Sequence, residues 1–306
     1  MNKEQLLKNL KSPTGPVDVV LDTDTYNEID DQFALAYLLQ NADRLHTVGI
    51  CAAPFHNGRS SSPADGMEKS YREIFKVLEL CERSDLKNIV FKGSEIYLPN
   101  ENTPVPSDAA SFMAEKAKEY SAEKPLYIVA IGAITNVASA FLLNPAMKES
   151  TVVVWLAGGA RHMPKCDEFN LSQDIAAARV IMGSGVPFVQ LPCAGVVDKF
   201  TTGKYELAHY YFDKNKLADY LARNTVAYCD RAEDFPWSKV IWDVTAVAWL
   251  LNENGRFMQD SVEETRLPGY DNIYEAPLAG TAMTYVYRIW RDALFCDMTK
   301  KIAGEI

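Results

Sequence analysis

The stretch VDVVLDTDTYNEIDDQF (residues 17–33) changes within a few residues from an apolar run to a group of acidic side chains. Residues 17–22 are typical of a buried β-strand, and the residues after the acidic group have the apolar spacing of a helix. Four aspartates lie at the end of the predicted strand and in the turn that follows it: Asp22, Asp24, Asp30 and Asp31. Helix N-termini favour acidic residues, which accounts for Asp30 and Asp31 but not for the other two. Because clustered carboxylates repel one another, this turn is a candidate site for a hard cation such as Ca²⁺, which prefers oxygen ligands.

Strand-like runs and helical patterns alternate along the first two thirds of the chain. Besides residues 17–22, the runs cover residues 47–52, 89–91, 126–131, 151–156 and 188–191. Apolar strands separated by helices predict an α/β fold, in which a mostly parallel sheet has helices on both faces. No linker or internal repeat divides the sequence, so we expect a single domain over residues 1–306. In such sheets ligands bind at the carboxyl ends of the strands, where the acidic turn lies.

Beyond residue 191 the pattern becomes mainly helical. We expect helices over residues 205–224 and 242–251, an aromatic and acidic loop at 228–239, and one last helix over residues 284–303. The segment YLPNENTPVPSD (residues 97–108) contains three prolines and is predicted to be a surface loop, either a lid or an excursion.

Composition and charge limit the classes of function. The 306 residues are 48 % hydrophobic and have a net charge of −10, without a cluster of Lys and Arg. This balance argues against a nucleic-acid partner, which requires a basic surface, and favours a small molecule or a cation. The six cysteines form no Cys-x-x-Cys pair and are interpreted as reduced thiols. Since we find neither a signal-peptide pattern nor an apolar run of membrane-spanning length, we expect a soluble, cytoplasmic protein.

Two families share the pattern of an apolar strand that ends in Asp-x-Asp. The haloacid dehalogenase superfamily uses the first aspartate, here Asp22, as a nucleophile that accepts a phosphoryl group with the help of Mg²⁺. That motif requires Thr or Val where this chain has Tyr26, and no second acidic pair is evident late in the chain. The sequence more closely resembles the inosine-uridine preferring nucleoside hydrolase family, whose fingerprint continues through a short turn to Asp-Asp, as in DTDTYNEIDDQF.

Three later segments resemble the nucleoside hydrolases in the same order. LYIVAIGAITNVASAF (residues 126–141) is similar to the segment in which the residue before the glycine, here Ile131, offers its carbonyl oxygen to the metal. WLAGGARHMPKCDEFNLSQD (residues 155–174) is similar to the segment that binds the ribose. VIWDVTAVAWLL (residues 240–251) is similar to the segment whose aspartate, here Asp243, completes the metal site. The resemblance implies a nucleoside hydrolase-like, Rossmann-like fold and cleavage of a ribonucleoside into base and ribose.

The resemblance also implies the roles of the acidic residues. Asp24 is expected to bind Ca²⁺ and to accept the proton of the attacking water. Asp31, Asp243 and the carbonyl oxygen of Ile131 are expected to complete the calcium site. Asp30 is expected to accept a hydrogen bond from a ribose hydroxyl. For Asp22 we expect only support of these groups, and for Glu28 orientation or solvation.

Three more residues are expected to contact the ribose. Asn57, after the second strand, matches a polar position of the family. Glu168 and Asn170 alternate along the chain, so in an extended segment they point to the same side while Phe169 points into the core. Of the four histidines, His56 lies in a loop expected to border the site, but no catalytic role is assigned to it.

Three further residues are weaker candidates for the site. His162, in the shortened loop at 159–168, could fill the space of an asparagine often found in the family. Arg288 and Arg291 could approach the substrate, although exposed charges on the last helix are the simpler interpretation.

The chain departs from the family in ways that affect substrate choice. The turn between Asp24 and Asp30 is two residues longer, and Trp242 stands where many members have a histidine that can protonate the leaving base. We expect Trp242 to stack on the base, as in purine-specific members, unless it only packs in the core. The predicted enzyme is therefore a calcium-dependent, purine-preferring ribonucleoside hydrolase that forms a homo-oligomer. The alternative classes are a nucleoside- or ribose-binding protein without turnover and a haloacid dehalogenase-like phosphatase.

Overall fold

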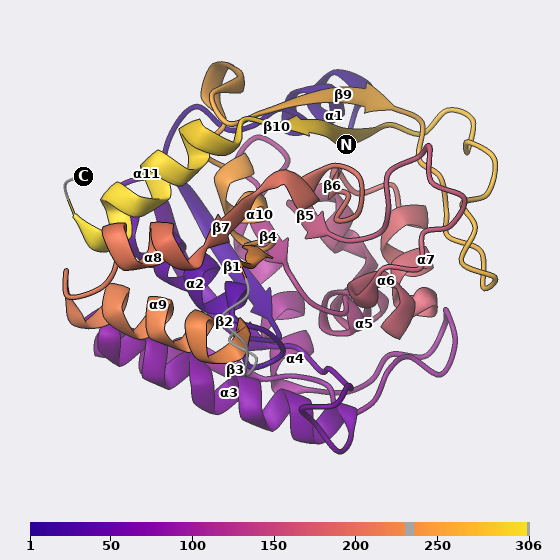
Figure 1. The fold of residues 1–306 in the computed structure, drawn as a ribbon. Coiled ribbons are helices and arrows are strands. Elements are labelled where there is room, and N and C mark those ends of the chain that lie inside the picture. The colour runs from indigo at the N-terminus through magenta and orange to yellow at the C-terminus, as the bar shows by residue number, and fades with distance from the viewer. Residues whose placement is uncertain (230–235, 305–306) are drawn as a thin grey trace.

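The protein is built around an eight-stranded sheet, seen in a computed structural model that describes residues 1–229 and 236–304 (Figure 1). Neighbouring strands are parallel except for the last pair, which is antiparallel. The expected mostly parallel sheet is therefore confirmed. In spatial order the strands are β3 (Val90–Lys92), β2 (Leu45–Ala52), β1 (Val17–Thr23), β4 (Leu126–Ala130), β5 (Thr151–Leu156), β6 (Phe188–Leu191), β10 (Met283–Ile289) and β9 (Met258–Glu263).

Helices cover both faces of this sheet (Figure 1). Because side chains alternate along a strand, Val19 and Leu21 of β1 enter one apolar core and Val20 enters the other. The first core is completed by α2 (Asp30–Gln40), α3 (Pro63–Leu80), α9 (Lys216–Cys229), α10 (Val244–Trp249) and α11 (Arg291–Ala303). The second core is completed by α4 (Asp108–Lys116), α5 (Thr135–Leu143) and α7 (Ile175–Gly183). The short helices α6 (Phe169–Gln173) and α8 (Lys204–Tyr210) add Leu171 to the second core and Leu207 to the first, whereas α1 (Lys3–Asn9) contributes to neither.

The C-terminal part differs from the sequence-based expectation. Residues 284–303 do not form one helix, because residues up to Ile289 belong to β10 and α11 begins at Arg291. The segment TYVYRI is rich in β-branched and aromatic residues, which favour a strand, and it fills the place between β6 and β9. The predicted helix at 205–224 is interrupted between α8 and α9. A separate two-stranded sheet of β7 (Thr201–Gly203) and β8 (Ser238–Val240) has no counterpart in the prediction.

Of the two loops predicted from the sequence, the structure describes one completely and the other only in part. Residues 230–235 of the predicted loop at 228–239 lie outside the described residues. The loop at 97–108 is anchored to the body, since Leu98 and Val105 are buried and the Leu98 amide donates to Asp174 Oδ2 over 2.9 Å. It is therefore an excursion over α5 and α7 rather than a lid over the cavity described below. Within the described residues, no helix combines the length and apolar character needed to cross a membrane.

Candidate active site

A cavity of about 390 Å³ lies at the carboxyl edge of the sheet. The turns that follow β2, β1, β4, β5 and β6 supply its walls, together with the residues just before α10. Eight of the nine predicted site residues line it: Asp30, Asp31, Asn57, Ile131, Glu168, Asn170, Trp242 and Asp243. The ninth, Asp24, lies behind this wall, fully buried. Segments more than two hundred residues apart in the sequence thus meet where a parallel sheet places its ligands.

Three carboxylates form the acidic floor of the cavity. One carboxylate oxygen each from Asp30, Asp31 and Asp243 lies within 4.8 Å of the others. The first two open α2, and the third directly precedes α10, which packs on α2. The Thr23 hydroxyl donates to Asp31 Oδ1 over 2.6 Å and fixes the direction of that side chain. This arrangement brings together two of the predicted metal ligands, with Asp30 as the third member of the group.

Burial dominates the electrostatics of this floor. It raises the pKa of Asp31 to about 7, with a further contribution from the neighbouring Asp30 carboxylate. It also raises the pKa of Asp30 to about 6, although the nearby Lys239 ammonium opposes the shift. The pKa of Asp243 lies well above its ordinary value because of burial and of its acidic neighbours. The raised pKa values mean that ionising this floor is unfavourable without a positive ligand nearby, so the floor is matched to a cation.

Asp24 is positioned to complete a cation site. Neither of its buried carboxylate oxygens has a hydrogen-bond partner among the described residues. Burial and the adjacent Asp31 raise its pKa well above the ordinary value. Buried polar atoms are almost always paired, so two orphaned oxygens beside a carboxylate cluster indicate a missing ligand. Because the donors are hard oxygens, without a His or Cys in the group, the residues fit a hard metal cation.

Asp22 is buried and its carboxylate is held by Asn136. Its Oδ1 accepts from the Asn136 side chain over 2.8 Å, and Asn136 also donates to the Ala52 carbonyl oxygen. Burial raises the pKa of Asp22 to about 7, and the bond from Asn136 opposes this shift. The Asn136 amide therefore ties the ends of β1 and β2 together behind Asp24.

Asn170 holds the main chain of the cavity wall. Its amide nitrogen donates to the carbonyl oxygens of Ile131, over 3.2 Å, and of Leu156, over 3.1 Å. The opposite amide orientation would place an oxygen against two carbonyl oxygens, so the network fixes this one. The side-chain oxygen of Asn170 remains for a ligand in the cavity, as an acceptor only.

The predicted geometry around Glu168 is wrong, although Glu168 and Asn170 both line the cavity. The segment is not extended, because α6 begins at Phe169, and Phe169 is 37 % exposed rather than buried in the core. Glu168 is the N-cap: its carboxylate accepts from the amides of Asn170 (2.9 Å) and Leu171 (3.2 Å) and from Gly158 (2.8 Å). These three bonds satisfy free donors of the first helical turn and of the glycine loop.

The sequence prediction missed an ion pair at the cavity. Glu28 lines the cavity and forms an ion pair with Lys239, which is contributed by β8. Burial acts to lower the pKa of Lys239, but the carboxylates of Asp30 and Glu28 outweigh it and raise that pKa. No sequence signal connects residues 211 positions apart, so only the fold reveals this pair.

Two residues after β6 also line the cavity without having been predicted: Cys193 and Ala194. The sequence could have indicated them, because they follow a predicted parallel strand and therefore lie at the edge of the sheet where ligands bind. The histidines considered above, His56 and His162, are exposed and do not line the cavity.

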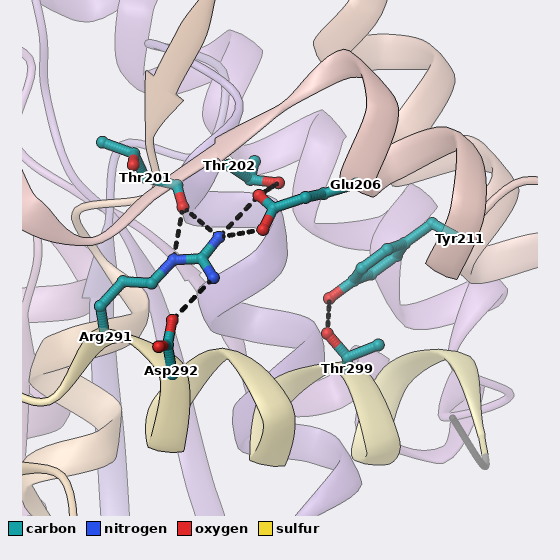
Figure 2. Close-up of polar contacts among 7 residues, drawn as sticks. All are labelled: Thr201, Thr202, Glu206, Tyr211, Arg291, Asp292 and Thr299. Atoms are coloured by element: carbon teal, nitrogen blue, oxygen red, sulfur yellow. Dashed lines mark hydrogen bonds and ion pairs between the residues drawn. The ribbon is translucent and has the colours of Figure 1, made fainter.

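The two arginines considered above lie elsewhere. Arg291 donates to the Thr201 carbonyl oxygen and to both carboxylate oxygens of Glu206, over 2.5 and 2.6 Å (Figure 2). Its guanidinium thereby fastens α11 to β7 and α8. The Arg288 guanidinium lies 4.1 Å from the ring centre of Trp290 and does not reach the cavity.

Comparison with known proteins identifies similar chains. The family model described as inosine-uridine preferring nucleoside hydrolase matches residues 19–286. A pyrimidine-specific ribonucleoside hydrolase, RihA of Escherichia coli, is 24 % identical over 218 residues, which are 63 % of this chain and 69 % of RihA. A probable uridine nucleosidase of Arabidopsis thaliana is 25 % identical over 236 residues, covering 69 % of this chain and 70 % of that protein.

Solved structures show the same fold. A plant nucleoside hydrolase superposes with a TM-score of 0.73 at 17 % identity, covering 94 % of this chain and 99 % of that one. A purine-preferring ribonucleoside hydrolase from Gardnerella vaginalis superposes with a TM-score of 0.71 at 17 % identity, covering 94 % of this chain and 98 % of that one.

Proposed function

Because this chain belongs to the inosine-uridine preferring nucleoside hydrolase family, which hydrolyses the N-glycosidic bond of ribonucleosides, we propose that it does so with a calcium ion and prefers purine nucleosides. The observation that supports the metal is the pair of orphaned carboxylate oxygens on Asp24, next to the carboxylates of Asp31 and Asp243. The resemblance to haloacid dehalogenases is set aside, because the family match covers most of the chain.

The calcium ligands that we propose are Asp24, Asp31, Asp243 and the carbonyl oxygen of Ile131. When bound, such a cation lowers the pKa of a water molecule and binds the ribose hydroxyls. Thr23 keeps Asp31 in place, and Asn170 fixes the Ile131 carbonyl through its own hydrogen bond. The chain therefore pre-organises its oxygen donors before any ligand arrives.

The protein residues then divide the remaining tasks. Cleavage passes through a transition state in which the sugar resembles an oxocarbenium ion. Asp24 accepts the proton of the attacking water, and Asp30 accepts a hydrogen bond from a ribose hydroxyl. The Asn170 side-chain oxygen can accept a second one. The negative charge of the acidic floor stabilises the positive charge that develops on the sugar.

Trp242 supports the preference for purines. The indole lines the cavity, is half-buried, and directly precedes Asp243. The indole also packs against the apolar core, and this contact holds the ring in a fixed orientation. A flat aromatic surface beside the sugar site can stack on a nucleobase, and a bicyclic purine offers the larger surface.

The test is an assay of reducing sugar with inosine, guanosine, adenosine and uridine. We expect release of ribose with purine nucleosides, loss of activity after chelation, and recovery with Ca²⁺. Release from uridine alone would refute the purine preference, and undiminished activity of fully chelated protein would refute the metal. Binding of nucleosides without any release of ribose would identify a nucleoside-binding protein instead.

The assembly and the compartment complete the proposal. We propose a cytoplasmic homo-oligomer, supported by the absence of a Cys-x-x-Cys pair among the cysteines of the sequence and by the prevalence of symmetric oligomers. Light scattering during size-exclusion chromatography gives the mass in solution, and a value of 34.2 kDa would show a monomer.

A further inference from the structure

The turn between β1 and α2 (residues 24–29) is fixed from outside by one arginine. Arg59 donates to the carbonyl oxygens of Asn27 and Glu28, each over 3.2 Å. Its guanidinium lies 4.5 Å from the ring centre of Tyr26 and 5.4 Å from that of Tyr228. The three contacts with Tyr26, Asn27 and Glu28 thus hold the turn in one conformation, with Asn27 and Glu28 lining the cavity.

The Glu28 carboxylate has partners of its own, which exclude it from the metal site. It pairs with the Lys239 ammonium through Oε2 and accepts from the Tyr228 hydroxyl, over 3.4 Å, through Oε1. It is absent from the group formed by Asp30, Asp31 and Asp243. A carboxylate that is already neutralised by a lysine has no need of a cation, so Glu28 is available for another task.

The carboxylate still has acceptor capacity toward the cavity. A carboxylate offers about four acceptor positions on its two oxygens, and the Lys239 and Tyr228 donors use one position on each. The remaining positions, one on each oxygen, suit a ligand with two neighbouring N–H donors, because such pairs bind a carboxylate in a bidentate manner.

The place of Glu28 indicates which part of a nucleoside it meets. In the proposed function the acidic floor of Asp30, Asp31 and Asp243 faces the sugar hydroxyls. Glu28 lines the same cavity two residues before Asp30, and Arg59, from the segment after β2, donates to its carbonyl oxygen. Lys239, its ion-pair partner, precedes Trp242 by only three residues, so the indole and Glu28 belong to the same end. That end receives the base.

We propose that Glu28 determines specificity by accepting hydrogen bonds from the N1–H and N2–H donors of guanine. Adenine presents a lone pair at N1, which the carboxylate repels, and hypoxanthine lacks the second donor. Uracil carries a single N–H between two carbonyl oxygens, which face the carboxylate unfavourably. This inference rests on the proposed function, since it requires a nucleoside in the cavity with its base beside Trp242.

The experiment compares kcat/KM for guanosine and adenosine in the wild type and in Glu28→Gln. We expect the wild type to prefer guanosine by about tenfold to a hundredfold, because hydrogen bonds to charged groups discriminate on that scale. In Glu28→Gln the ratio should fall to about one or below, because an amide offers one donor and one acceptor, as the adenine edge requires. Both substrates are measured with the same preparation of each protein, so partial loss of folded enzyme lowers both kcat/KM values equally and leaves their ratio unchanged.

Glu68→Gln is the matched control. Glu68 is ion-paired with Lys92 over 2.7 Å, and its side chain is 32 % exposed against 33 % for Glu28, but it does not line the cavity. The ratio of kcat/KM for guanosine to that for adenosine in Glu68→Gln should equal the ratio in the wild type. A wild type that hydrolyses adenosine as well as guanosine, or a Glu28→Gln variant with an unchanged ratio, would overturn the inference while leaving the proposed function intact.

If no nucleoside is hydrolysed, the proposed function fails and binding decides the inference. Isothermal titration calorimetry of the full chain with guanosine and with adenosine then gives the two affinities. Tighter binding of guanosine that disappears in Glu28→Gln supports the role of Glu28. Equal affinities, or no binding of either nucleoside, refute it.

Discussion

Gly132 lies directly against the carboxylate of Asp24, so that a β-carbon at residue 132 would be 2.9 Å from both Cγ and Oδ1 of Asp24. Real β-carbons do not approach other atoms so closely, and the Ala53 side chain, at 3.3 Å, limits movement on another side. The glycine after β4 therefore serves as space for the proposed base rather than as a flexible hinge.

Gly132→Ala is expected to displace Asp24 and to lower both turnover and calcium affinity. We expect kcat to fall about tenfold or more, because small displacements of catalytic groups are costly. Kinetics with inosine and calorimetric titration with Ca²⁺ measure the two effects. Gly15→Ala is the control, because nothing lies within 4 Å of its added β-carbon. Wild-type kinetics in Gly132→Ala would show that Asp24 can move without consequence.

Asp24→Asn is expected to remove nearly all turnover while the fold persists. The substitution keeps the shape and one oxygen but deletes the proton acceptor, and positioned proton transfer contributes ~100-fold to 10,000-fold. Turnover of inosine and the melting temperature are measured together, with the exposed Asp85→Asn as the control. A near wild-type rate in a variant that still binds Ca²⁺ would assign the base to another residue.

The metal-free protein is expected to lose stability as the pH rises from about 4 to about 7. The folded-state pKa values of Asp22 and Asp31, each about 7, and of Asp30, about 6, lie above those of the unfolded chain. In this range the folded state therefore binds more protons than the unfolded state, and the free energy of unfolding falls with pH. Calcium binds the ionised carboxylates, so its stabilising effect should grow over the same range.

Calorimetric melting of chelated and calcium-loaded protein at several pH values checks this prediction. Asp31→Asn removes one of the titrating groups and should reduce the slope of the melting temperature against pH. A melting temperature of the chelated protein that rises with pH, together with a calcium effect that does not depend on pH, is the contrary result.

Trp242→Ala is expected to lose turnover of purine nucleosides with little change in the melting temperature. Aromatic stacking contributes ~0.5 to 1.5 kcal/mol beyond burial, so we expect about a threefold to tenfold loss from this term. Trp242→Phe retains a flat ring and should recover part of the activity. A large fall in the melting temperature with unchanged relative rates would show that the indole only packs against the core.

The sequence alone determined six of the eight strands of the main sheet, β1 to β6, and the end of the sheet at which the site lies. β5 and β6 have the predicted bounds, and β1 differs from its prediction by one residue. Because parallel strands place their carboxyl ends at one edge, the acidic turn was predicted to lie at the ligand-binding edge of the sheet. Ile131 and the segment around Glu168 were assigned to the site through the resemblance to the family. Asp243 joined them through its resemblance to the family, and the cavity contains these residues.

Only the tertiary structure decided which atoms hold these residues in place. Glu168 caps α6 and thereby turns Phe169 outward, an outcome of local hydrogen bonding that an alternating pattern cannot reveal. The contact between Gly132 and Asp24 and the ion pair between Glu28 and Lys239 join segments far apart in the chain. Strand and helix patterns record which face of each element is buried, whereas these contacts depend on distances between elements, which packing alone sets.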